Sequence, residues 1–137
     1  MRIFIAEKSP VIQQRLQEML TEIAGVYLVG ISSNVNYIIE LIQATNPDVL
    51  IIDSDLFSNN ITRVLSKIRK YYSTLVLIVF VDDYLDQYKK QAWQFRVDYF
   101  LTKSHEFFKI TEIIQKLSIQ QQADQAIPGI IHNKFKE

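Results

Sequence analysis

The chain of 137 residues lacks cysteine, has only three glycines and three prolines, and contains no long hydrophobic run. Without cysteine it forms no disulfide, thiolate metal site or cysteine nucleophile, which is compatible with a reducing compartment. No apolar stretch approaches the roughly 18 to 20 residues that span a bilayer, and the N-terminus lacks the anatomy of a signal peptide. We therefore expect a cytoplasmic protein with no membrane partner.

The sequence also lacks an excess of charge of either sign. Fifteen Lys and Arg residues balance fifteen Asp and Glu residues, which gives a net charge of zero. A module that binds nucleic acid through many phosphate contacts carries a basic excess, so we expect no direct nucleic-acid partner. The apolar fraction of 48% is ordinary for a globular protein, and the length suits a single domain.

Five short apolar runs have the character of buried strands. They are continuous and rich in β-branched residues, whereas a strand with one exposed face would alternate between apolar and polar residues. Such runs favour a parallel sheet that helices cover on both faces. The five runs are residues 3–6, 27–31, 49–52, 75–81 and 99–101.

Segments with helical spacing of apolar residues follow each of these runs. Ser9 and Pro10 are a typical N-cap and first turn, and Asn46 with Pro47 should end the second helix. We expect helices over about 10–25, 34–45, 60–72 and 106–118, and a fourth after Asp82 and Asp83. The alternation predicts an α/β fold of (βα)5 type, a doubly wound, flavodoxin-like, five-stranded parallel sheet. We expect residues 1–120 to form the domain and the glutamine-rich residues 121–137 to form a polar tail, after an extension of the last helix by a turn or two beyond Ser118.

Charged side chains follow three of the expected strands, at the edge where ligands bind in such folds. Glu7 and Lys8 follow the first strand, Asp53 ends the third, and Lys103 follows the fifth. Three pieces of the chain here resemble, in order, the receiver domains of response regulators, the CheY-like family. They are IAEKSPVIQQRLQEML, PDVLIIDSDL and VDYFLTKS, and the resemblance runs from Arg2 to about Leu117.

The resemblance implies a non-enzymatic module of two-component phosphorelay signalling, with a histidine kinase or another signalling protein as partner. It assigns Asp53 as the phospho-acceptor and Lys103 as the lysine that contacts the phosphoryl group. It also assigns Mg²⁺ to Glu7, Asp53 and the backbone carbonyl of Asp55. The chemistry agrees, because phosphoryl transfer depends mostly on positioning and on neutralising the oxygens.

Aromatic residues near the fifth strand suggest an interface. Phe100 falls at the family's conformation-linked aromatic position, and Tyr88 and Trp93 on the preceding helix enlarge an apolar patch. Such patches mark interfaces, although aromatic residues at helical spacing also build cores. The patch allows a homodimer through the fourth helix and the fifth strand.

Two residues depart from the family's pattern where the chemistry depends on them. Lys8 stands in place of an acid that ligates the metal, so the formal charges of Glu7, Lys8, Asp53 and Lys103 sum to zero. We expect Lys8 to pair with Asp53 or Glu7, no cofactor to be required, and Mg²⁺ to bind weakly. Val81 stands in place of a Thr or Ser and cannot donate a hydrogen bond to a phosphoryl oxygen.

A lesser departure concerns the backbone before the fifth strand. Arg96 and Tyr99 occupy positions where the family often has glycine. A left-handed conformation at Arg96 would cost about 1 kcal/mol or more, so we expect the backbone there to be remodelled.

These departures predict an atypical receiver that acts through protein contacts, with weak or absent Mg²⁺-dependent phosphorylation. One alternative is a conventional receiver that a histidine kinase phosphorylates on Asp53, with Asp82 as a replacement carboxylate. Another is a flavodoxin-like enzyme or nucleotide binder. The sequence disfavours the latter, because Gly25, Gly30 and Gly129 form no glycine-rich phosphate loop.

Overall fold

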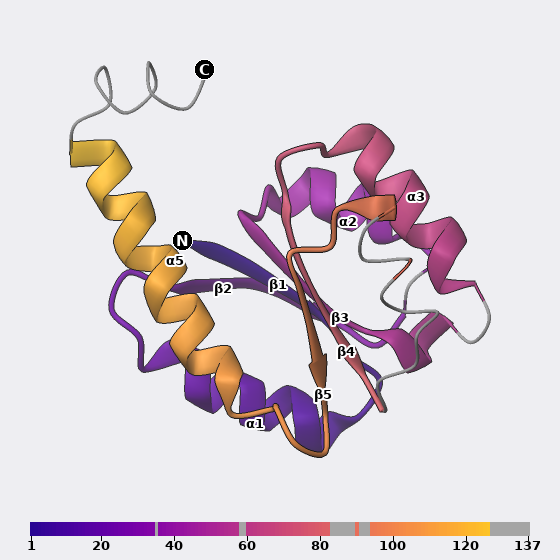
Figure 1. Ribbon diagram of the computed structural model, residues 1–137, viewed down its shortest axis with the longest axis horizontal. Helices are drawn as coiled ribbons and strands as arrows, with labels where there is room; N and C mark the ends of the chain where they lie inside the picture. The colour runs from indigo at the N-terminus through magenta and orange to yellow at the C-terminus, as the bar shows by residue number, and fades with distance from the viewer. Residues whose placement is uncertain (35, 58–59, 83–89, 91–93, 127–137) are drawn as a thin grey trace.

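The computed structural model describes residues 1–34, 36–57, 60–82, 90 and 94–126 (Figure 1). Within them, five parallel strands form one sheet in the order β2-β1-β3-β4-β5. The predicted doubly wound parallel sheet is therefore confirmed, and each strand lies within one residue of its predicted bounds. The strands are β1 (Arg2–Ala6), β2 (Tyr27–Ser32), β3 (Val49–Asp53), β4 (Val76–Val81) and β5 (Tyr99–Thr102).

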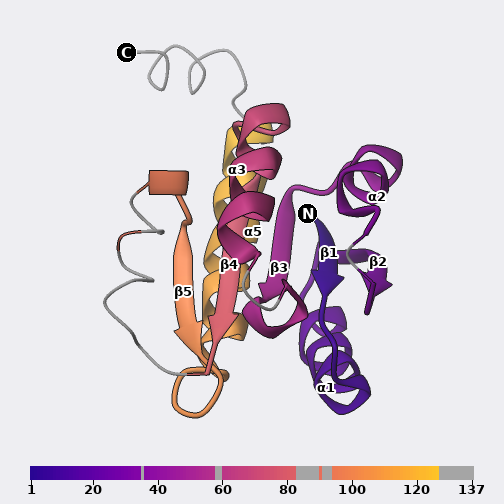
Figure 2. The same cartoon turned by 90° about the vertical axis from the view of Figure 1, so that its right-hand side faces the viewer.

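Helices cover both faces of the sheet. In Figures 1 and 2, α1 (Pro10–Thr21) and α5 (Lys109–Ala126) lie on one face, and α2 (Ile38–Thr45) and α3 (Ile61–Tyr71) lie on the other. A short 3-10 helix, η1 (Ser54–Phe57), follows β3. Alternate residues of each strand point to opposite faces, so Ile3 and Ile5 pack toward α1 and α5, whereas Phe4 and Ala6 pack toward α2 and α3. The core is thus two apolar layers, one on each face of the sheet.

Gly30 in β2 is required by this packing. The ring of Phe4 occupies the space that a Cβ atom at position 30 would need. The register of β1 against β2 also shifts between Ile3 and Phe4. An aromatic core residue therefore lies directly against the backbone of the edge strand.

Some helix bounds differ from the prediction. The first helix begins as expected, because the Ser9 hydroxyl accepts a hydrogen bond from the Ile12 amide at 3.3 Å. The second begins at Ile38 instead of about residue 34, because Ser32 and Asn34 use their side chains to form turns. The last helix continues to Ala126, well into the segment predicted to be a tail. Most of the predicted fourth helix lies outside the described residues.

The expectation of a remodelled backbone at Arg96 is wrong. Arg96 keeps the left-handed conformation, with φ of 52°. The guanidinium of Arg69 in α3, which is 9% exposed, donates to the carbonyl of Arg96 at 2.6 Å and to that of Phe95 at 3.0 Å. These hydrogen bonds fix the peptide groups and offset the strain that the conformation costs.

Candidate functional site

The carboxyl ends of β1, β3 and β5 bring three of the predicted site residues together. Glu7 directly follows β1, Asp53 is the last residue of β3, and Lys103 directly follows β5. Because β1 and β3 are neighbours and β4 separates β3 from β5, the long Lys103 side chain reaches across one strand. Figure 2 shows these ends at the same edge of the sheet, at the arrowheads.

Lys103 lies among three carboxylates. Its Nζ atom is 2.9 Å from Asp53 Oδ2, 3.4 Å from Glu7 Oε1 and 3.9 Å from Asp55 Oδ2. The side chains of Glu7 and Asp53 are each only 1% exposed, whereas 20% of the Lys103 side chain is exposed. The site is therefore a buried acidic pair that one lysine covers from the solvent side.

Backbone amides hold the two buried carboxylates in place. The Ser9 amide donates to Glu7 Oε2 at 2.9 Å, and the Asp55 amide donates to Asp53 Oδ1 at 3.0 Å. The other oxygens, Glu7 Oε1 and Asp53 Oδ2, accept no hydrogen bond from the described residues. Lys103 approaches Asp53 Oδ2 as an ion-pair partner outside the geometry of a directed hydrogen bond. On each carboxylate one oxygen is therefore held by a backbone amide, and the other faces the Lys103 ammonium.

Burial and mutual repulsion change the acidities at the site. Burial, then contact with the Asp53 carboxylate, raises the pKa of Glu7 from 4.5 to about 7. Burial, with the charges of Asp53 and Asp82, also raises the pKa of Asp55. Burial alone would lower the pKa of Lys103, but its contacts with Asp53, Glu7 and Asp55 outweigh this and raise it. Near neutral pH, Glu7 therefore holds a proton in part of the molecules, while Lys103 stays charged.

Lys8 lies outside this cluster. Its side chain is exposed and forms no ion pair with a carboxylate of the described residues, so the expected pairing with Asp53 or Glu7 is not observed. The buried group of Glu7, Asp53 and Lys103 then has a formal charge of −1, two carboxylates less one ammonium. The formal charge of zero predicted from the sequence included Lys8, so it does not hold for this buried group.

Val81 is fully buried at the end of β4, in the apolar cluster of the α2 and α3 face. Its carbonyl accepts a hydrogen bond from the Lys103 amide at 2.9 Å, so its backbone lies beside the site, and its side chain has no hydroxyl to offer there. Phe100 is half-buried against the same cluster. The other predicted interface residues, Tyr88 and Trp93, lie outside the described residues.

The side chains at the site suit a divalent cation in kind. Glu7 Oε1 and Asp53 Oδ2, which face Lys103 without a hydrogen bond, are hard ligands of the type that Mg²⁺ prefers, and the carbonyl of Asp55 would be a third. However, no three His, Cys, Asp or Glu side chains of the described residues form a group that could hold a metal ion. The fit is therefore partial, with two buried carboxylates as its basis.

Two features of the site were not predicted from the sequence. The Asp55 carboxylate faces Lys103, whereas only the backbone of Asp55 was expected to take part. The amide of Ser9 orients Glu7, whereas Ser9 was expected only to cap the first helix. The relevant signals are the acidic residue two positions after Asp53 and the N-cap two positions after Glu7.

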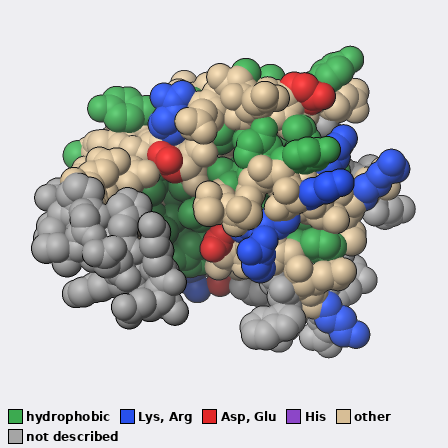
Figure 3. Space-filling view, turned by 90° about the horizontal axis from the view of Figure 1, so that it is seen from above, with side chains coloured by type: hydrophobic (Ala, Val, Ile, Leu, Met, Phe, Trp, Pro, Cys, Tyr) green, Lys and Arg blue, Asp and Glu red, His purple; other side chains and the backbone are tan. Residues whose placement is uncertain are grey.

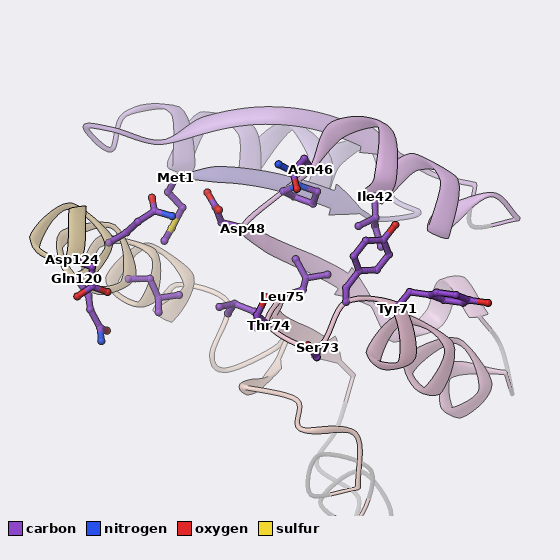
Figure 4. A pocket seen from close by; sticks show the side chains of 15 residues that line it. Met1, Ile42, Asn46, Asp48, Tyr71, Ser73, Thr74, Leu75, Gln120 and Asp124 are labelled. Atoms are coloured by element: carbon purple, nitrogen blue, oxygen red, sulfur yellow. The ribbon is translucent and has the colours of Figure 1, made fainter. Parts of the chain in front are cut away.

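A hollow of about 570 Å³ lies away from this site, where the amino-terminal ends of the strands meet the end of α3 (Figures 3 and 4). Met1, Asp48, Tyr71 and Leu75 are among its lining residues, and α5 forms one wall with Gln120 and Asp124. None of the predicted site residues lines this hollow. The hollow is therefore separate from the acidic pair.

Comparison with known proteins shows a family likeness. The family model of the response regulator receiver domain matches residues 3–115. No curated protein matches the sequence. Among the described residues, no helix has the length and apolar character needed to cross a membrane.

Solved structures of low sequence identity share the fold. A two-component response regulator of the LuxR family from Aurantimonas sp. SI85-9A1 superposes with a TM-score of 0.75 at 16% identity, covering 87% of this chain and 85% of that one. A DNA-binding response regulator of the LuxR family from Staphylococcus aureus gives 0.73 at 22%, covering 85% and 98%. The non-phosphorylated receiver domain of the stress response regulator RcsB from Escherichia coli gives 0.74 at 18%, covering 88% and 94%.

Proposed function

The chain belongs to the receiver domain family of response regulators, and from this premise we propose that it is an atypical receiver with weak or absent Mg²⁺-dependent phosphorylation. Receivers of this family are signalling modules that contact histidine kinases and other signalling proteins. This one would act through such contacts, with Asp53 in the acceptor position. The observation that carries the proposal is Lys8, an exposed lysine where the family has a second acidic ligand.

Electrostatics support weak metal binding. Mg²⁺ is normally held by one or two carboxylates together with substrate phosphates and water, and here the charge of Lys103 already offsets one of the two negative charges of the buried pair, Glu7 and Asp53. The ion would also compete with a proton, because the pKa of Glu7 is raised to about 7. Glu7, Asp53 and the Asp55 carbonyl would hold the ion, and bound Mg²⁺ would neutralise phosphoryl oxygens.

The side chain of Val81 supports poor readout of any phosphorylation. A threonine or serine at this position would offer a hydroxyl to a phosphoryl oxygen on Asp53, whereas valine offers only methyl groups. Val81 is packed into the core of the α2 and α3 face, and its side chain would gain no hydrogen bond by moving toward the site. A phosphoryl group would therefore gain its protein contacts from Lys103 and backbone amides alone.

Intact mass measurement after incubation with Mg²⁺ and acetyl phosphate tests the proposal. We expect little or no gain of one phosphoryl group in the wild-type chain. A stoichiometric adduct that is absent in Asp53→Ala would contradict the proposal and favour a conventional receiver.

One observation favours the conventional alternative. The charge of Asp82 contributes to the raised pKa of Asp55, so the two carboxylates lie near each other at the rim of the site. Together they would restore negative charge that Lys8 removes. If this version holds, the chain binds Mg²⁺ measurably, and Asp82→Ala weakens that binding, whereas a charge change at the distant Lys116 does not.

A further inference from the structure

Basic side chains collect on α3, on the opposite side of the sheet from α1 and α5. Between Leu56 and Val81 the chain has no acidic residue, but it has four basic ones. Arg69 is buried and pairs with Asp98. The other three, Arg63, Lys67 and Lys70, are exposed and make no ion pair with a carboxylate of the described residues. Figure 3 shows Lys and Arg side chains gathered over this part of the surface.

The three exposed cations form a stripe. Their spacing of four and three residues places them on one face of the helix, over about 10 Å along its axis. One acid, Glu40 in α2, lies among the residues that line the groove beside Arg63 and Lys67. The whole chain has no net charge, so the positive charge of this stripe is local and does not come from a general excess of basic residues.

A groove runs beside the stripe, between α2 and α3. Its volume is about 200 Å³, below the usual range of sites for small ligands, so it suits side chains of a partner better than a cofactor. Ile38, Ile39 and Val64 provide apolar lining, and Arg63 and Lys67 stand at its edge. Tyr37, at the start of α2, is 64% exposed and adds an aromatic side chain of the kind enriched at interfaces.

We propose that the stripe of Arg63, Lys67 and Lys70, with the adjoining groove, docks an acidic amphipathic segment of a partner protein. Carboxylates one helical turn apart would match the spacing of the three cations, and apolar side chains between them would enter the groove. The inference rests on the proposed function as a contact module, and it names the chemistry of one partner.

A nucleic-acid partner fits these features less well. A nucleic-acid site gains affinity from many phosphate contacts, whereas this stripe offers three cations over a short distance. Glu40 lines the groove and would repel a continuous phosphate backbone. The apolar lining would also make no favourable contact with a charged and hydrated sugar-phosphate chain. Charge together with apolar surface is the complement of a polypeptide.

Fluorescence anisotropy with a labelled peptide of about 15 residues, long enough for a surface helix, tests the proposal. The peptide carries Glu and Leu at helical spacing, and the controls are the same peptide with Gln for Glu and a single-stranded oligothymidine. We expect the acidic peptide to bind with a Kd below about 100 µM at low salt and more weakly as salt is added. The Gln peptide and the oligonucleotide should bind much more weakly.

Variants locate the binding on the surface. Lys67→Glu should weaken peptide binding about five- to tenfold, because a reversed charge turns an attraction into a repulsion of similar size. Lys116→Glu is the matched control, since it reverses an exposed lysine on α5, across the sheet, and should leave binding unchanged.

Three outcomes overturn the inference: no binding of the acidic peptide, equal effects of the two variants, or tighter binding of the oligonucleotide. The assay involves neither Mg²⁺ nor phosphorylation of Asp53. Its failure is therefore distinguishable from failure of the acetyl phosphate experiment.

Discussion

At the scale of single residues, Glu7 determines how the molecule responds to pH. Its carboxyl is buried next to Asp53, and its pKa is raised from 4.5 to about 7. Between these two values the folded chain holds a proton on Glu7 that the unfolded chain has released. Folding then takes up a proton, so the free energy of unfolding falls as pH rises through this window.

Glu7→Gln should remove this component of the pH dependence. In urea titrations with EDTA present, we expect the wild-type chain to lose about 1–3 kcal/mol of stability relative to the variant between pH 5 and pH 8. The direction follows because the buried carboxylate becomes charged in the wild type, whereas the amide does not ionise. Parallel pH profiles for the two proteins would show that the site does not hold the proton on Glu7.

Arg96 is the second residue whose conformation carries a measurable cost. Its φ of 52° suits glycine better than arginine. We expect Arg96→Gly to stabilise the fold by about 0.5–1 kcal/mol in urea titrations. Arg96→Ala removes the same charge without relieving the strain, so it serves as the control and should give no such gain. A gain of equal size in both variants would assign the effect to charge.

At the scale of elements, Arg69 joins the end of α3 to the start of β5. Its guanidinium donates to carbonyls of Phe95, Arg96 and Leu75, and it pairs with Asp98, which in turn accepts from the Leu77 amide at 2.8 Å. One buried side chain therefore fixes the backbone just before β4 and the backbone just before β5. The cost of desolvating the guanidinium is offset because each of its nitrogen atoms has a carbonyl or carboxylate as a hydrogen-bond acceptor.

Arg69→Met keeps the packing of the stem but leaves those carbonyls without their donor. We expect a loss of about 3 kcal/mol in the free energy of unfolding, because buried polar groups lose their partners. Arg63→Met, at an exposed position of the same helix, should cost less than about 0.5 kcal/mol. Equal losses in the two variants would contradict the structural role given to Arg69.

The elements also show where sequence reasoning succeeds. The strands were predicted closely because a continuous apolar run such as residues 49–52 is buried on both faces only in the interior of a sheet. The start of α2 was missed because Ser32 and Asn34 form turns with their side chains, which the spacing of apolar residues does not reveal. The extension of α5 by about two turns beyond Ser118 was expected, but its last residue was not predicted, because a polar, glutamine-rich sequence is compatible with both a helix and a tail.

The same limits apply to the site. The strand ends alone predicted that Glu7, Asp53 and Lys103 come together, because parallel strands end at one edge. They do not say which way a side chain turns after the strand. Lys8 turns to solvent and Asp55 turns toward Lys103, and both outcomes depend on local backbone direction.

At the scale of the whole molecule, charges are separated although they cancel in the sum. Carboxylates collect around Lys103 at the carboxyl edge of the sheet, and the exposed cations Arg63, Lys67 and Lys70 collect on α3. The net charge of zero, taken from the composition, reveals neither the acidic cluster around Lys103 nor the basic stripe on α3. This separation of charge underlies both proposals made above, a weakly active acceptor site and a separate surface that docks an acidic partner.

The central claim is that Lys8 and Val81 make the acceptor site inactive or nearly so. Its most direct test is the intact mass of the wild-type chain and of a Lys8→Asp, Val81→Thr double variant after incubation with Mg²⁺ and acetyl phosphate. The account predicts little adduct on the wild type and a clear gain of one phosphoryl group on the double variant, lost again when Asp53→Ala is added. Ready phosphorylation of the wild type, with no further gain in the double variant, would contradict it.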